Sequence, residues 1–230
     1  MTARVASVAL AALTTIGVLA PQAAAQTASS SAPLARWEIG GGGVFAGGVD
    51  LGEQTAELTS NTGTSGSPST FFVTDSRMKP ALGVQARMGV FLTRRFAIEG
   101  GVRFTKPTFE IRTSQDVENA AGVTAEETLS QYLFDGSAVW HFKEATYGKG
   151  AVPFLFGGAG YLRELHEGGA LVEDAAEYHG GGGVKWWFGW GVHKFGVRAE
   201  AGFSVRDDGA DVEKRRHVVP VAAGSLIWRF

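Results

Sequence analysis

The residues of this sequence that could do chemistry are its histidines and the acidic and hydroxyl side chains near them. The five histidines are His141, His166, His179, His193 and His217. A zinc hydrolase of the HExxH type needs two histidines one helical turn apart, and the segment HEGGA that begins at His166 lacks the second one. The sequence has no cysteine, which excludes a thiolate metal site, a cysteine nucleophile and a disulfide framework. We therefore expect neither a metal nor a cofactor.

A serine nucleophile would need a basic histidine within hydrogen-bond reach. No His-x-Ser pair occurs, and Ser204 and Ser225 lie near no histidine along the chain. His141, His179 and Asp135 fall on the inward side of the alternating segments described below. Interior hydrogen bonding is the favoured role for them, and a metal or acid–base site is the alternative. We predict that the protein is not an enzyme.

Charge and glycine content argue against two further classes of ligand. The formal net charge is −2 and charged residues make up 19% of the chain, so no strongly basic surface points to nucleic acid. The tracts Gly40–Gly43 and Gly180–Gly183 open no recognisable helix and are followed by no Lys-Ser/Thr, which argues against a phosphate-binding loop. In a narrow barrel such tracts would leave room for long interior side chains from neighbouring strands.

The first residues have the features of an export signal. Arg4 precedes the apolar stretch Val5–Ala20, and the segment QAAAQ then offers a small-x-small cleavage site after Ala25. A membrane-anchoring helix is the alternative, but the stretch is shorter than the ~20 residues that a span needs. We predict a signal peptide at residues 1–25, a short N-terminal segment at 26–35 and one domain at 36–230.

Period-two alternation of apolar and polar residues dominates the remaining chain, as in strands with two unlike faces. Eight segments show it: Arg36–Gly47, Pro80–Leu92, Phe96–Arg112, Thr128–Phe142, Ala151–Leu165, Ala175–Phe188, Phe195–Arg206 and Arg216–Phe230. Most exceed the ~5–6 residues of ordinary strands and suit the ~9–11 tilted residues that cross a bilayer. The pattern predicts an all-β fold, an eight-stranded antiparallel up-and-down transmembrane β-barrel.

The connections between these segments alternate in length. Residues 93–95, 143–150 and 189–194 form short connections, whereas 48–79, 113–127, 166–174 and 207–215 form longer or more polar ones. Short turns on one side and longer loops on the other are typical of bacterial transmembrane barrels. The stretch Asp50–Thr70 is rich in Ser, Thr and Gly, and we expect it to be a mobile loop.

The two faces of the segments carry different residue types, and this difference predicts which face points outward and which points into the barrel. One face carries the charges Arg87, Glu99, Arg103, Asp135, Lys185, Arg198 and Glu200. The other carries aromatic residues near the strand ends: Trp37, Phe91, Phe96, Trp140, Phe142, Trp186, Phe188, Phe195, Trp228 and Phe230. Clustering near strand ends is what an interfacial aromatic belt requires. We predict an outward apolar band and paired interior charges that plug the lumen; a hydrated passage is the alternative.

Three segments resemble successive strands of the OmpA/OmpX-like family of outer membrane β-barrel domains: VPFLFGGAGYL (Val152–Leu162), GGGVKWWF (Gly181–Phe188) and FGVRAEAGF (Phe195–Phe203). The terminal Leu226, Trp228 and Phe230 resemble the assembly signal of that family. The resemblance implies a bacterial outer membrane location, contact with lipid and lipopolysaccharide, and assembly by periplasmic chaperones and the outer membrane insertion machinery. Nothing after Phe230 corresponds to a peptidoglycan-binding domain, so cell-wall tethering is not implied.

The function that follows is a structural or surface-interaction role, with exposed loops and a plugged interior. The basic residues Lys214, Arg215 and Arg216 are candidates for contact with lipopolysaccharide. A small-solute channel is the first alternative and an outer membrane lipid-modifying enzyme is the second. A soluble lipocalin-like barrel, with its apolar face turned inward, is the third.

Overall fold

The computed structural model describes residues 37–58, 69–114, 122–144, 150–166, 172–188, 194–207 and 216–230. These residues form twelve strands arranged in two sheets. The predicted signal peptide, its cleavage site at Ala25 and the segment 26–35 lie outside the described residues, as do Lys214 and Arg215. Within the described part of the chain, no helix is long and apolar enough to span a membrane.

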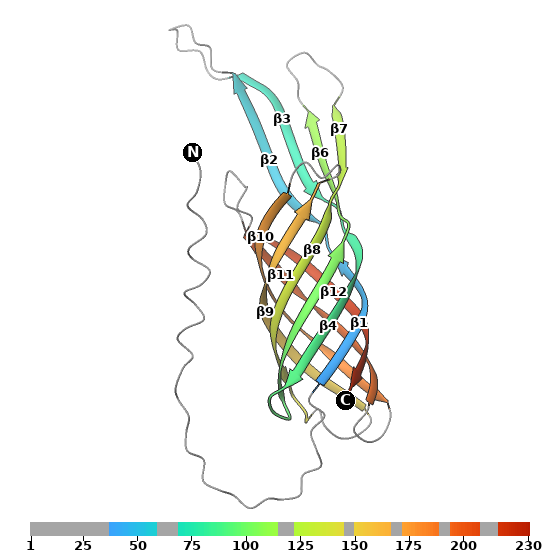
Figure 1. The fold of residues 1–230 in the computed structure, drawn as a ribbon. Coiled ribbons are helices and arrows are strands. Elements are labelled where there is room, and N and C mark those ends of the chain that lie inside the picture. The colour runs from blue at the N-terminus through green and yellow to red at the C-terminus, as the bar shows by residue number, and fades with distance from the viewer. Residues whose placement is uncertain are drawn as a thin grey trace, which may run out of the picture. The chain divides into compact units, whose positions relative to one another are not determined.

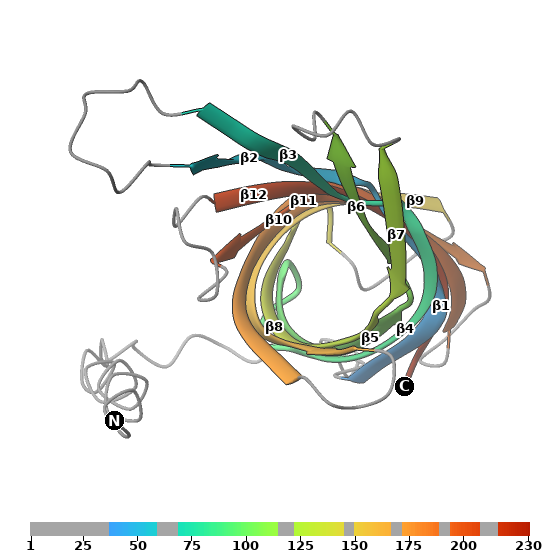
Figure 2. The same ribbon diagram turned by 90° about the horizontal axis from the view of Figure 1, so that it is seen from above.

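Eight of the strands close into an antiparallel barrel in the order β1-β12-β11-β10-β9-β8-β5-β4 (Figures 1 and 2). They are β1 (Trp37–Ala46), β4 (Ala81–Phe91), β5 (Phe96–Thr105), β8 (Ser130–His141), β9 (Gly150–Leu165), β10 (Val172–Phe188), β11 (Lys194–Asp207) and β12 (Arg216–Arg229). The prediction of an eight-stranded antiparallel barrel is confirmed. Each barrel strand overlaps one of the eight alternating segments.

The first and last barrel strands pair with each other and close the ring. The Trp37 amide donates to the Phe230 carbonyl at 3.1 Å, and the Phe230 amide donates to the Trp37 carbonyl at 3.0 Å. Glu38 stands opposite Arg229 in the same register. A closed ring has no exposed strand edge, so the backbone polar groups of the wall are satisfied within the wall.

A second sheet, of four strands, extends from the end of the barrel opposite the C-terminus and the short turn between β4 and β5 (Figure 1). Its strands, in the order β2-β3-β6-β7, are β2 (Val49–Leu58), β3 (Ser69–Met78), β6 (Thr108–Ser114) and β7 (Val123–Thr128). The expectation of loops at 48–79 and 113–127, and of a mobile loop through Asp50–Thr70, is therefore wrong for these strands. Polar residues occupy both faces of this sheet, so its sequence lacks the clean alternation of a half-buried strand.

The expected single strand Phe96–Arg112 is also wrong, because the chain leaves the barrel in the middle of it. β5 ends at Thr105 and β6 begins at Thr108, with Lys106 and Pro107 between them. Proline has no backbone N–H and cannot donate to a ladder. The partners change at this point: β5 pairs with β4 and β8, whereas β6 pairs with β3 and β7.

The glycine tract of β1 allows close approach of the neighbouring strand. A Cβ added at Gly42 would lie 2.0 Å from the carbonyl oxygen of Gly224, whereas a Cβ added at Gly224 would meet nothing within 4 Å. We expect Gly42→Ala to destabilise the folded barrel by about 1–3 kcal/mol, because the strands must shift. Gly224→Ala, on the paired strand, is the matched control and should change stability by less than about 1 kcal/mol. Urea unfolding in detergent micelles measures both, and equal effects would contradict the close approach.

Candidate functional site

The interior of the barrel is filled by charged side chains. All seven charges predicted for the inner face lie there, with side chains that are buried or nearly so: Arg87, Glu99, Arg103, Asp135, Lys185, Arg198 and Glu200. They come from β4, β5, β8, β10 and β11. The period-two pattern places them on one face of each strand, and closure of the ring turns that face toward the axis.

One chain of ion pairs begins near the end of the barrel with the short turns. Arg229 Nη2 lies 2.8 Å from Glu38 Oε2, and Lys185 Nζ lies 2.6 Å from Glu38 Oε1. Lys185 is completely buried (0% exposed) and also donates to Glu99 Oε1 at 3.0 Å. Two carboxylates therefore compensate the buried ammonium group. Without such partners, a buried charge is strongly unfavourable.

The same chain of ion pairs continues along the barrel axis, with cations and anions in alternation. Arg198 lies 2.6 Å from both Glu99 and Glu200, and Arg87 lies 3.6 Å from Glu200 and 3.3 Å from Asp135. From Arg229 to Asp135 the chain holds four cations and four anions, so its formal charge is zero. Each internal member contacts an opposite charge on both sides, an arrangement that polarises and strengthens the hydrogen bonds it contains.

A second cluster lies nearer the four-stranded sheet. Glu177, which is fully buried, accepts from Arg103 and, at 3.2 Å, from Arg206. Arg206 also lies 3.6 Å from Glu164, and Gln131 donates to that carboxylate. The two cations and two anions of this cluster again balance.

Several members of these clusters were missed by the sequence analysis, namely Glu38, Glu164, Glu177, Arg206 and Arg229. The alternation of inward and outward positions could have identified them, since each occupies the charged face of its strand. Their pairing partners could not be found in this way. Glu38 and Lys185 are separated by 147 positions in the sequence, and only the strand order of the closed barrel makes them neighbours.

An apolar layer closes the interior at the end with the short turns. It consists of Phe91, Ala97, Val139, Val152, Phe154, Trp187 and Ile227. The Arg229 guanidinium lies 4.2 Å from the ring centre of Phe91 and 4.1 Å from that of Trp187, distances typical of cation–π contacts. This layer covers the first member of the ion-pair chain.

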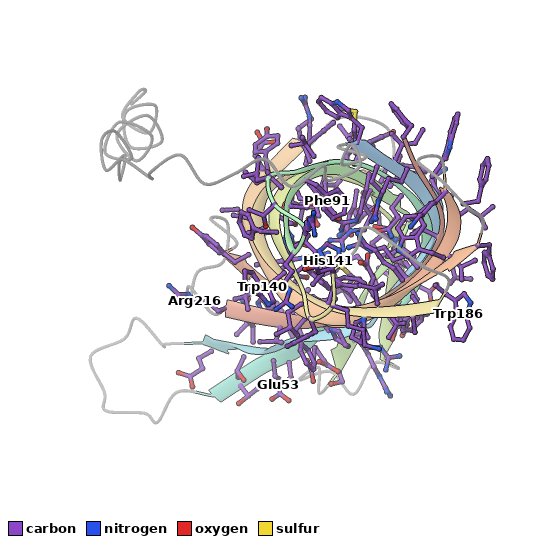
Figure 3. The ribbon with its side chains drawn as sticks, turned by 90° about the horizontal axis from the view of Figure 1, so that it is seen from below. Glu53, Phe91, Trp140, His141, Trp186 and Arg216 are labelled. Atoms are coloured by element: carbon purple, nitrogen blue, oxygen red, sulfur yellow. The ribbon has the colours of Figure 1, made fainter. Side chains whose placement is uncertain are left out.

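The assignment of Phe91 to the outer aromatic face is wrong. Phe91 is 4% exposed and lies inside the ring with His141, whereas Trp186 lies outside (Figure 3). Phe91 occupies the same inward-facing set of alternate positions on β4 as Gln85 and Arg87. Its position along the strand predicts the inner face, whereas its aromatic side chain suggested the outer one. The other nine aromatic residues assigned to the outer face are exposed or partly exposed.

The interior histidines make structural contacts. The His141 ring nitrogen Nδ1 lies 3.2 Å from the Arg95 carbonyl oxygen. His179 Nε2 lies 2.8 Å from Ser137 Oγ and 3.8 Å from Asp135. In a catalytic triad the acid holds the ring nitrogen that faces away from the nucleophile, whereas here both groups approach the same nitrogen. Within the described ranges, no group of three or more histidine or acidic side chains is placed to hold a metal ion.

Little space remains between the interior charges. A cavity of about 20 Å³ lies beside Asp135 and His179, and another of about 10 Å³ lies beside Glu38 and Glu99. A site needs roughly 10–15 Å³ of this kind of volume to hold one water molecule. Each cavity therefore has the size of about one water molecule, and the side chains around both are held in ion pairs.

The outer face of the barrel is apolar. Leu226 is 73% exposed, and Trp228 stacks on Phe195 with ring centres 5.5 Å apart. A broad hollow of about 670 Å³ crosses β11, β12, β1, β4 and β5, where the small residues Gly41 and Gly100 face outward among larger apolar side chains. The predicted terminal motif, Leu226, Trp228 and Phe230, lies on this face.

At the opposite end, the four-stranded sheet is joined by its own ion pairs. Lys79 Nζ lies 2.7 Å from Glu110 and 2.8 Å from Glu126, and Arg77 also contacts Glu110. The hydrogen bond from Lys79 is the main cause that holds the pKa of Glu110 below its ordinary value. The same contact raises the pKa of Lys79. These groups hold β3, β6 and β7 together at their base.

A mouth cavity of about 280 Å³ lies where the two sheets meet. The four-stranded sheet contributes Leu51, Met78 and Phe109, and the barrel contributes Glu164 and Glu173. Its lining combines apolar walls with charged groups.

No protein-family model matches the chain, and no curated protein matches it. Among solved structures it is similar to the crystal structure of the outer membrane protein OprG from Pseudomonas aeruginosa, with 10% identity and a TM-score of 0.49. The match covers 86% of this chain and 97% of that chain. Nothing about binding or activity is transferred at this level of similarity.

Proposed function

We propose that this protein is a β-barrel of the bacterial outer membrane with a closed lumen and a structural or surface-interaction role. The observation that carries the proposal is inverted polarity: large apolar side chains cover the outside of the barrel, and the charges are paired inside. A soluble lipocalin-like barrel would require the opposite arrangement. Strands with an apolar outer face and polar interior are typical of outer membrane barrels.

The two ends of the barrel differ, and the difference supports one orientation of the protein in the membrane. The turn between β4 and β5, the C-terminus and the aromatic side chains of Trp140, Trp186 and Trp228 lie at one end. The four-stranded sheet extends from the other end (Figure 1). Short turns are periplasmic and long extensions extracellular in bacterial barrels, so we place the four-stranded sheet outside the cell.

The partners in this proposal follow from that location. The apolar band contacts the acyl chains of lipid, and the extracellular end faces lipopolysaccharide, for which Arg216 at the start of β12 is one available cation. Leu226, Trp228 and Phe230 act as the assembly signal that the insertion machinery recognises after periplasmic chaperones deliver the chain. The proposed structural or surface-interaction role involves no cofactor and no enzymatic activity.

The closed lumen makes a direct prediction for conductance. Protein folded in detergent and inserted into a planar bilayer should show no large, steady single-channel conductance, because ion-paired side chains occupy the axis. Insertion is verified by recovering the protein and comparing the gel mobility of unboiled and boiled samples. A large steady conductance from verified insertions would overturn the closed lumen and favour the small-solute channel. Absence of a detergent requirement for solubility would overturn the membrane location.

A further inference from the structure

The mouth cavity has the size and chemistry of a small-molecule site. Its volume of about 280 Å³ lies close to the lower end of the range for such sites, roughly 300–1,000 Å³. Residues from β2, β3, β6, β9 and β10 contribute to its walls, so both sheets build it. The ligand that fits is compact.

One part of the cavity is apolar. Leu51, Met78, Phe109 and Leu129 line it. The last of these is buried, at 3% exposed, and its amide donates to the Pro107 carbonyl at 2.9 Å, where the chain passes between the two sheets. Thioether and aromatic side chains adapt to flat apolar groups, so these walls favour a ligand with a hydrocarbon or aromatic part.

The other part of the cavity carries negative charge that the protein only half compensates. Glu164 and Glu173 stand directly opposite each other on β9 and β10, and like charges in that position are unfavourable. Arg206 lies 3.6 Å from Glu164. Glu173 has no hydrogen-bond or ion-pair partner among the described residues, and no described lysine or arginine lines the cavity.

His166 does not supply the missing partner of Glu173. His166 lines the cavity, but its Nδ1 lies 3.0 Å from Glu127, so this ring nitrogen serves a different carboxylate. His217, also in the lining, comes from β12. A cation from solution would relieve the repulsion between Glu164 and Glu173.

We propose that the mouth cavity binds a small organic cation, a primary amine with an aromatic or other apolar group. The ammonium group donates to the Glu173 carboxylate, and the apolar group packs against Phe109 and Met78. An ammonium group near Phe109 gains a cation–π contact as well. This site goes beyond the proposed function and does not depend on it, since it uses only the junction of the two sheets.

The test is isothermal titration calorimetry on the full, folded protein in detergent micelles, with phenethylamine as the probe. Two analogues of similar shape are titrated alongside it: neutral 2-phenylethanol and anionic phenylacetate. We expect phenethylamine to bind at least about tenfold more tightly than 2-phenylethanol, because it makes a charge-assisted hydrogen bond. Phenylacetate should bind more weakly than both.

Glu173→Gln is the diagnostic variant. It should reduce phenethylamine affinity by roughly tenfold or more and leave 2-phenylethanol affinity unchanged. Glu53→Gln is the matched control, because Glu53 lies on β2 next to cavity residues but is exposed and points away from the barrel (Figure 3). This control should bind phenethylamine as the wild type does.

Three results would overturn the proposal. They are wild-type affinity in folded Glu173→Gln, an equal loss in Glu53→Gln, or wild-type binding of phenylacetate as tight as that of phenethylamine. If Glu173→Gln fails to fold, as judged by the mobility of the unboiled sample, the comparison of the three ligands on the wild type decides alone. None of these results bears on the membrane location, which the tests above address separately.

Discussion

Glu99→Gln is expected to destabilise the folded barrel by about 3–5 kcal/mol, the usual cost of removing one partner from a buried ion pair. Glu99 lies between Lys185, at 3.0 Å, and Arg198, at 2.6 Å. Glutamine keeps the shape and an acceptor oxygen but removes the charge that both buried cations require. Unfolding by urea in detergent micelles should show a lower midpoint, and the folded band of the unboiled sample should weaken.

The control for this substitution is Glu144→Gln. Glu144, just after β8, pairs at 3.3 Å with Arg94 in the turn between β4 and β5, and both side chains are about half exposed. An exposed pair contributes only about 0–1 kcal/mol, so this variant should behave almost as the wild type. The double variant Glu99→Gln/Lys185→Met should recover part of the loss, because removing one cation restores the balance of charges in the chain of ion pairs. Equal effects of Glu99→Gln and Glu144→Gln would mean that the interior charges are hydrated and the lumen is open to water.

Val102→Arg tests the outer face. Val102 lies on β5, is 46% exposed and borders the broad apolar hollow of the barrel wall. If this face contacts hydrocarbon, arginine there should cost about 2–4 kcal/mol in lipid vesicles, the value for a position near the bilayer midplane. The folded fraction in vesicles, followed by gel mobility across a urea series, measures the change.

Val123→Arg is the matched control, since it makes the same change on β7 of the four-stranded sheet. Val123 is 67% exposed, and our proposal places it in water outside the membrane. A substitution at an exposed site of this kind usually changes stability by less than about 0.5 kcal/mol. Equal effects at the two positions would show that the barrel wall and the four-stranded sheet share one solvent, and the membrane assignment would fail.

The four-stranded sheet shows where reading the sequence by alternation fails. The pattern finds strands because a half-buried strand must place unlike residues on successive positions. β7 is exposed along nearly its whole length, so no such demand acts on its sequence. Alternation therefore predicts a loop over residues 113–127, which include most of β7. Pro107 was a second signal that could have been used, since it interrupts the ladder between β5 and β6.

The sequence by itself determined the local properties of the barrel. Period-two alternation identified the barrel strands and placed Lys185, Arg198 and Glu200 on one face, because the face of a side chain depends only on its position along its own strand. Where that rule was set aside for residue type, at Phe91, the assignment was wrong.

Only the tertiary structure decided which charges meet. Glu38 binds Arg229 and Lys185 because β1 closes against β12 and because the narrow ring brings β10 within reach across the axis. Register and closure are properties of the whole ring, and a shift of one residue between two strands would turn every side chain of one strand to the other face. The mouth cavity is non-local in the same way, since Phe109 and Glu173 come together only where the two sheets join.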